Sequence, residues 1–226
     1  MGRGASRAKR HGGGGGGSAV NIKDMISSRT DENKQQVDDV LKVADVMTKR
    51  YGNDVAIEGA FQTGEMKGRN SNVLGYYDGA GNICMNSKYL NNQDMDGVMD
   101  QCFKEGYHPS RGNKSGMYAV AAHEYGHSLT ANAAKAMGTD FDTAAERIVT
   151  EARKGTKHRG NIQFGAAISG YAKSHNAETI AEAYADVLCN GRRAKAESHA
   201  VVKTMDKYLK TGSKAKKSKK LIPNER

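Results

Sequence analysis

Two histidines four residues apart, in a run that favours helix, constrain this chain more than any other feature of its sequence. His123 and His127 lie in segment 116–137, which is rich in alanine and is followed by Gly138. Such a composition predicts one continuous helix. Side chains four apart project from the same helix face, so both imidazoles can reach one metal ion. Glu124 then points at a water on that ion and can accept its proton.

This spacing also occurs by chance on helices whose histidines only pack or meet solvent. A catalytic zinc site needs three protein ligands and a water, so the pair requires a further ligand. Position 133 is alanine, which excludes the metzincin pattern with its third histidine. Two acids remain. Glu146 follows His127 with eighteen residues between them, a spacing seen in some aminopeptidases, and Glu178 lies further along the chain.

The residues around Glu178 favour it over Glu146. Tyr171 precedes Glu178 by seven positions, and Glu178-Thr-Ile-Ala-Glu182-Ala has the pattern E-x-x-A-E-A. Together with the histidine motif, these features resemble the catalytic domain of anthrax-lethal-factor-like peptidases, within the gluzincin zinc metallopeptidases. The resemblance covers roughly residues 70–190. Similar zincin-like domains occur in proteins of bacteriophages and mobile elements.

The resemblance implies that Zn2+ is the cofactor and that a protein or peptide is the substrate. A zinc-bound water would hydrolyse the peptide bond, with Glu124 as general base and Tyr171 as donor to the oxyanion. Glu182 would orient a ligand imidazole, and strand Asn82–Asn86 would be the edge that binds substrate. The implied zinc ligands are His123, His127 and Glu178. Independently, two acids on one stripe of an apolar helix are costly to bury without a cation. A solvated acidic face and an ordinary packing role for Tyr171 are the simpler alternatives.

Periodicity and turn residues predict an α+β domain, zincin-like by resemblance, with a small mixed sheet, the histidine helix and a following helical part. A hairpin is predicted from 73–77 and 82–86. Segment 157–169 reads as irregular chain, and Asn176 as the N-cap of a helix that stops at Gly191. The predicted helices are 31–50, with Val37, Val40, Leu41, Ala44 and Met47 on one apolar stripe, then 94–104, 116–137, 142–154, 176–189 and 194–209.

Charge divides the 226 residues into a body and two basic tails. Residues 1–18 carry four basic and no acidic side chains, and residues 207–226 carry eight basic and one acidic. Since the net charge is +10, the residues between them are close to neutral. We therefore expect a disordered glycine-rich tail at 1–18, a metallopeptidase domain at 19–212 and a disordered basic tail at 213–226. Such tails contact nucleic acid or acidic surfaces, or simply remain solvated.

The rest of the sequence indicates a cytoplasmic protein. Three cysteines without a CxxC pair argue against a disulfide framework and read as buried small apolar residues. No signal peptide and no transmembrane segment is evident, so we expect a cytoplasmic location, association with a virion, or delivery by a non-classical route. The remaining histidines have no predicted site role: His11, His108, His158, His175 and His199.

Two rival functions follow from the same features. One is a catalytically silent zincin-like structural protein of a phage or mobile-element particle, anchored by its basic tails. The other is a nucleic-acid-binding protein, for which the tails are the only support.

Overall fold

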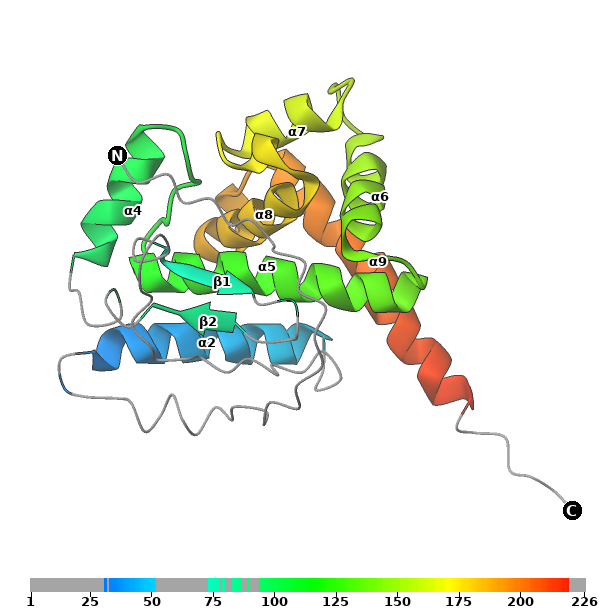
Figure 1. Ribbon diagram of the computed structural model, residues 1–226, viewed down its shortest axis with the longest axis horizontal. Coiled ribbons are helices and arrows are strands. Elements are labelled where there is room, and N and C mark those ends of the chain that lie inside the picture. The colour runs from blue at the N-terminus through cyan, green and yellow to red at the C-terminus, as the bar shows by residue number, and fades with distance from the viewer. Residues whose placement is uncertain are drawn as a thin grey trace, which may run out of the picture.

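A computed structural model describes residues 31, 33–51, 73–77, 79, 83–86, 89 and 94–219, with side chains as far as residue 209. This part of the chain is mostly helical, and the long helix α5 runs through its middle (Figure 1). The elements in order are α2 (Lys34–Tyr51), β1 (Gly75–Tyr77), β2 (Ile83–Met85), α4 (Met95–Lys104), α5 (Gly116–Met137), α6 (Phe141–Arg153), α7 (Asn161–Ile168), the 3-10 turn η2 (Ala172–Ser174), α8 (Asn176–Asn190), the 3-10 turn η3 (Gly191–Arg193) and α9 (Ala196–Lys219).

The helix that carries both motif histidines has the predicted bounds, because its two ends are specified locally. Ser115 accepts a hydrogen bond from the backbone N–H of Tyr118 and caps the start of α5. Gly138 follows the last turn with φ 64°, a left-handed conformation that glycine adopts without strain. Most side chains of α5 are buried, including both histidines, so this helix lies in the core.

Small residues let α5 and α8 approach each other closely, and this contact is the most extensive between any two elements described. Gly126 of α5 faces Ala181 of α8, and a Cβ atom added to Gly126 would lie 2.5 Å from the Ala181 Cα. Only glycine fits at that position. Gly126 stands between the two histidines in sequence, and Ala181 stands between Glu178 and Glu182. The contact therefore brings the two motifs together.

The predicted hairpin is confirmed. Strands β1 and β2 pair antiparallel, with Gly75 opposite Met85 and Tyr77 opposite Ile83. Both strands contact α5, and Ile83 and Met85 are buried. Within the described residues the sheet consists of these two strands, rather than the small mixed sheet that was expected.

The apolar stripe predicted on the first helix is confirmed in α2. Val37, Val40, Ala44 and Met47 are buried, and Leu41 is half-buried at the edge of the same face. This face packs against α5. The end of α2 is also tied to the last helix, because Arg50 donates two hydrogen bonds to Asp206 of α9, at 3.1 and 2.7 Å.

Three predictions about the helices are wrong: one helix was not predicted, one is longer than predicted, and one has a different N-cap. Segment 157–169 was expected to be irregular, but it contains α7, whose Phe164 and Ile168 are buried. The last helix, α9, continues past position 209 to Lys219, and its final turns extend away from the body (Figure 1). His175 rather than Asn176 caps α8, with its side chain accepting from the backbone N–H of Ala177. The predicted tail 1–18 lies outside the described residues.

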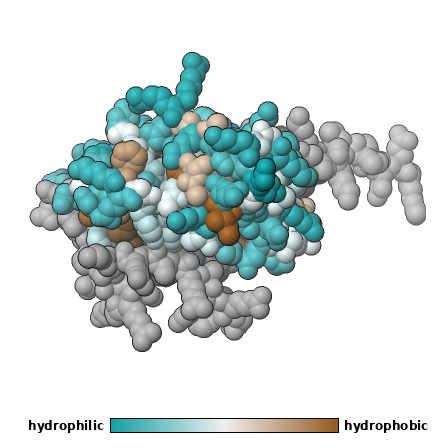
Figure 2. Space-filling model, turned by 90° about the horizontal axis from the view of Figure 1, so that it is seen from above, coloured by the Kyte–Doolittle hydropathy of each residue, from teal (hydrophilic) through white to brown (hydrophobic). Residues whose placement is uncertain are grey.

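The surface carries no broad apolar patch among the large hydrophobic residues described. Those exposed are Val46, Phe103 and Ile162, on three different helices. The face in Figure 2 is mainly hydrophilic, with small and separate hydrophobic areas. None of the described helices is both long and apolar enough to cross a membrane.

Candidate metal centre

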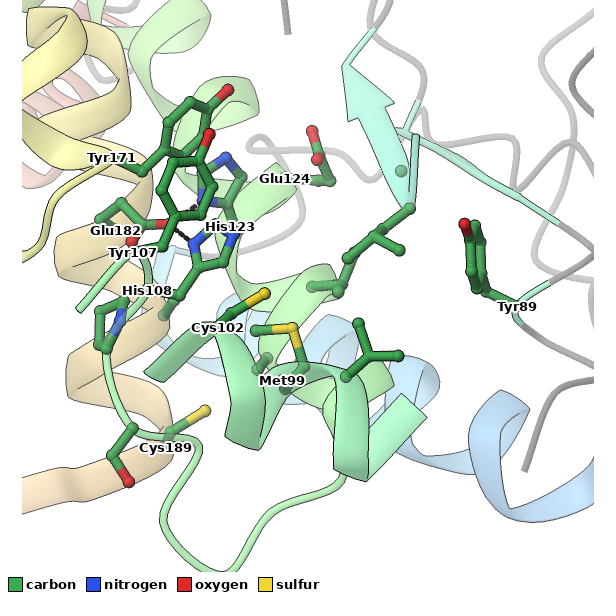
Figure 3. A pocket seen from close by; sticks show the side chains of 18 of the residues that line it. Tyr89, Met99, Cys102, Tyr107, His108, His123, Glu124, Tyr171, Glu182 and Cys189 are labelled. Atoms are coloured by element: carbon green, nitrogen blue, oxygen red, sulfur yellow. Dashed lines mark hydrogen bonds and ion pairs between the residues drawn. The ribbon is translucent and has the colours of Figure 1, made fainter. Parts of the chain in front are cut away.

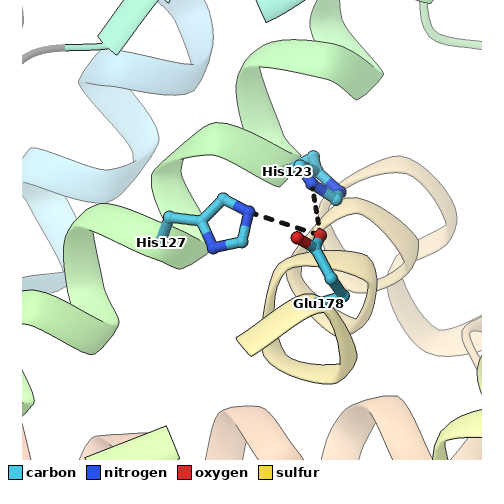
Figure 4. A group of neighbouring side chains, drawn as sticks. All are labelled: His123, His127 and Glu178. Carbon is cyan, nitrogen blue, oxygen red and sulfur yellow. Dashed lines mark ion pairs between the residues drawn. The ribbon is translucent and has the colours of Figure 1, made fainter. Parts of the chain in front are cut away.

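The two motif histidines meet a carboxylate from a distant part of the sequence where α5 crosses α8. His123 and His127 project from one face of α5 toward the carboxylate of Glu178 near the start of α8 (Figure 4). Glu178 Oε2 lies 3.2 Å from His123 Nε2 and 3.4 Å from His127 Nε2. All three residues are buried, and their ligand atoms lie within 4.8 Å of one another. This group could hold a metal ion.

The two distances from Glu178 Oε2 are those expected around a small tetrahedral ion. Two atoms that are each about 2.0–2.1 Å from such an ion are about 3.3–3.4 Å apart, close to both distances from Glu178 Oε2. Buried polar atoms normally have hydrogen-bond partners, and an exception needs an explanation. Glu178 Oε2 and His127 Nε2 are buried and have no hydrogen-bond partner among the described residues. A cation between them would satisfy both atoms.

The surroundings of Glu178 keep its carboxylate ionised, as a metal ligand must be. Burial alone would raise the pKa of Glu178, but the imidazoles of His123 and His127 outweigh burial and lower it. The rival acid Glu146 is exposed on α6 and does not belong to this group. The structure therefore brings Glu178, rather than Glu146, to the histidine pair.

Glu182, one turn after Glu178, contacts the opposite side of the His123 ring. Its Oε1 lies 2.7 Å from His123 Nδ1, and its Oε2 accepts a hydrogen bond from Ser169 Oγ at 2.7 Å. Burial would raise the pKa of Glu182, but the charge of His108 and hydrogen bonds from His108 and His123 lower it to about 2. A carboxylate at this position could orient a ligand imidazole, which is the role that the resemblance implies for Glu182.

His108 belongs to this network, which the sequence analysis missed. Its Nδ1 lies 2.8 Å from the same Glu182 Oε1 that contacts His123. Nothing in the sequence around His108 points to Glu182, which is 74 positions away. The proline that follows His108 indicates only an extended backbone.

Glu124 lies beside the histidine pair, against the hairpin. The backbone amide of Tyr77 in β1 hydrogen-bonds to its carboxylate, while its Oε2 is buried without a hydrogen-bond partner among the described residues. Burial raises the pKa of Glu124. Of the two strands, β1 is the one that contacts this carboxylate, while the substrate role expected for Asn82–Asn86 stays a prediction. Asn86 is fully buried and donates to the backbone oxygen of Val73.

Tyr171 is stacked on the ring of His123. The two ring centroids are 5.8 Å apart with an interplanar angle of 15°, and Tyr107 stacks on Tyr171 at 5.0 Å. Two backbone hydrogen bonds hold this arrangement, from Gly170 N to Gly106 O and from Tyr171 N to Tyr107 O. Tyr171 is thus placed by the loop between α4 and α5, as well as by its own segment.

A cavity of about 360 Å³ opens beside His123 and Glu124. Figure 3 shows Tyr171 and Glu124 on either side of His123 at this cavity, with Met99 and Cys102 of α4 along another wall. Most of its lining is apolar and comes from α4, α5, α8, the loop after α4 and the start of the hairpin. This apolar lining includes Val73, Leu74, Val98, Met99, Ala119, Val120 and Ala185. The site therefore adjoins a space suited to an apolar group.

The other expectations have mixed outcomes. His175 is exposed, and His158 Nε2 forms a hydrogen bond with Glu197 away from the site. Cys189 is buried as predicted and Cys102 is only partly buried, and both cysteines line the cavity. His199 is exposed on α9, and His11 lies outside the described residues.

Comparison with known proteins adds no relative. No family model matches the chain, no curated protein matches it, and no solved structure matches it. The functional assignment therefore depends on the geometry of the site and on the motif resemblance.

Proposed function

We propose that this protein is a zinc-dependent metalloendopeptidase of the gluzincin type, with a zincin-like α+β fold around α5 and α8. Its main support is the convergence of three buried ligand atoms from His123, His127 and Glu178. Two imidazole nitrogens and one carboxylate oxygen are the donor set of many catalytic zinc sites, which keep a fourth position open for water. When bound, zinc would supply Lewis-acid chemistry, acidifying a water and polarising the scissile carbonyl.

Glu124 is the general base in this proposal. A base must lie within reach of the proton it accepts and must have an accessible lone pair. Glu124 precedes His127 by three positions on α5, and its Oε2 has no hydrogen-bond partner among the described residues. Its raised pKa suits a carboxylate that takes a proton from water and then passes it to the leaving amine.

Tyr171 is proposed to donate a hydrogen bond to the carbonyl oxygen as negative charge develops on it. Replacing Tyr171 by Phe removes only the hydroxyl and leaves the ring stacked on His123. We expect kcat to fall by about 10²–10³-fold with zinc affinity unchanged, since loss of one oxyanion donor has this cost. Steady-state kinetics with a zinc titration would measure both, and a Tyr171→Phe enzyme with normal kcat would remove this role.

The cavity indicates which peptides the site would accept. Its volume of about 360 Å³ and its apolar lining suit a large apolar side chain next to the cleaved bond. The hairpin borders the site on the side of Glu124, which supports binding of an extended peptide alongside β1. We therefore propose a protein or peptide substrate with Leu, Met or Phe beside the scissile bond.

The decisive experiment combines metal analysis with digestion of a peptide library. Wild-type protein should bind one zinc ion and cleave peptides beside large apolar residues. Glu124→Gln should keep the zinc and lower kcat by about 10²–10⁴-fold, the usual contribution of a general base. Zinc binding without any cleavage would indicate a silent structural protein instead. Cleavage that survives in Glu124→Gln would remove this residue from its role.

A further inference from the structure

Glu182 is shared by two histidines on the same oxygen. Its Oε1 lies 2.7 Å from His123 Nδ1 and 2.8 Å from His108 Nδ1 (Figure 3). An ionised carboxylate only accepts hydrogen bonds, so both Nδ1 atoms carry a proton. For His123 this leaves Nε2 directed at Glu178, at a distance of 3.2 Å.

We infer that His108 is a positioning residue for the metal centre, which holds the Glu182 carboxylate against His123 so that His123 Nε2 points at the ion. This inference rests on the proposed function, because it assigns a role toward the zinc proposed there. His108 is not a ligand itself, since it belongs to no group of described residues that could hold a metal. Its effect is transmitted through one carboxylate.

The Glu182 carboxylate depends on protein donors. Its side chain is 1% exposed, so bulk water does not reach it while His108 is in place. Among the described residues, His123 and His108 donate to Oε1 and Ser169 donates to Oε2. Ser169 donates to the opposite oxygen. Without the hydrogen bond from His108, the carboxylate could rotate towards Ser169, and its hydrogen bond with His123 would weaken. The partners of a metal-bound imidazole set both its tautomer and its direction.

The backbone holds His108 in place. The N–H of His108 is 3.4 Å from the backbone oxygen of Cys102, and Tyr107 donates to the same oxygen at 2.8 Å. The His108 ring packs edge-on against Tyr171, with centroids 5.5 Å apart. The side chain of His108 is 15% exposed and lines the cavity, where it separates Glu182 from solvent. One loop therefore positions both Tyr171 and the carboxylate that orients His123.

Two substitutions in the full-length chain separate a donor role from simple packing. His108→Ala removes the donor, whereas the Nδ2 of His108→Asn can take the place of the imidazole Nδ1. Zinc affinity would be measured by competition with a chromophoric chelator, and the geometry of the site by the visible spectrum of the Co2+-loaded protein. We expect His108→Ala to bind zinc about 10–100-fold more weakly and to alter the Co2+ bands. His108→Asn should stay close to wild type in both.

The matched control is His158→Ala, which removes an imidazole paired with a glutamate at 2.7 Å outside the site. It should leave zinc affinity and the Co2+ spectrum unchanged. If His108→Ala does not fold, as judged by circular dichroism, His108→Gln replaces it with the same expectation, because its donor lies one bond further out.

Two results would overturn the inference. One is a folded His108→Ala or His108→Gln protein with the affinity and spectrum of wild type. The other is an equal loss in His108→Asn, because the effect would then not depend on the donor. Failure of the wild type to bind zinc would contradict both this inference and the proposed function. Tight zinc binding without peptide cleavage would contradict the proposed function alone, since the metal measurements need no activity.

Discussion

Two of the acids buried on α8, Glu178 near its start and Asp186 near its end, have very different surroundings. Glu178, in the first turn, faces two imidazoles, and its Oε2 has no hydrogen-bond partner among the described residues. Asp186, about two turns later, is equally buried. It accepts hydrogen bonds from the side chains of Asn190 and Ser198 and from the backbone N–H of Lys195.

These surroundings distinguish a carboxylate that holds the fold together from one that is placed to bind a ligand. Side chains on either side of the turn η3 donate hydrogen bonds to Asp186. This carboxylate therefore joins the end of α8 to the start of α9. Glu178 lacks such a shell and has its open oxygen directed at the histidine pair. A buried polar atom without a partner costs free energy, and a fold retains it where a ligand supplies the missing contact.

The largest expected effect comes from Glu178→Gln, which keeps the size of the side chain but removes the anionic ligand. Loss of a residue that only hydrogen-bonds to a metal ligand weakens metal binding about 10–100-fold. Zinc affinity should fall further in Glu178→Gln, and peptide cleavage should stop. The free energy of unfolding of the metal-free protein should change less than in Asp186→Asn, since Glu178 Oε2 has no hydrogen bond to lose. Zinc titration and chemical denaturation measure the two quantities.

Glu146→Gln is the matched control for this change, because Glu146 is the rival ligand and is exposed on α6. It should bind zinc as wild type does. Loss of zinc in Glu146→Gln together with normal binding in Glu178→Gln would reverse the assignment of the third ligand.

An intermediate effect is expected from Gly126→Ala, which acts on the contact between the two helices. The added methyl group would lie 2.5 Å from the Ala181 Cα, so the backbones must separate. Overpacking of this kind costs about 1–3 kcal/mol of stability. Zinc should also bind more weakly, because Glu178 moves away from the histidines. Gly155→Ala is the control, since its Cβ would meet nothing within 4 Å. Equal zinc affinity in the two variants would contradict the close-packing argument.

The smallest effect on the site is expected from Asp186→Asn, the counterpart of Glu178→Gln at the other end of α8. An amide nitrogen would replace one accepting oxygen and leave a buried donor unpaired, at a cost of about 1–3 kcal/mol in unfolding free energy. Zinc affinity should remain that of the wild type. A loss of zinc binding as large as that in Glu178→Gln would show that the two ends of α8 are not separable.

Several elements could be predicted because their signals are local. The bounds of α5 follow from Ser115 and Gly138, and the buried face of α2 follows from its apolar spacing. The convergence of Glu178 on the histidine pair was predicted from motif resemblance and not from geometry. Helix α7 was missed because its segment is short and contains Gly165. Its helical state depends on burial of Phe164 and Ile168, which propensity does not report.

The amino-acid sequence was enough to predict the ends of α5, the spacing that puts His123 and His127 on one face, and the pairing of β1 with β2. It did not reveal that His108 shares Glu182 with His123, or that β1 contacts Glu124. The physical reason is range. Turn, cap and periodicity preferences act over a few residues, whereas these contacts join residues 59 and 74 positions apart and depend on how whole helices pack.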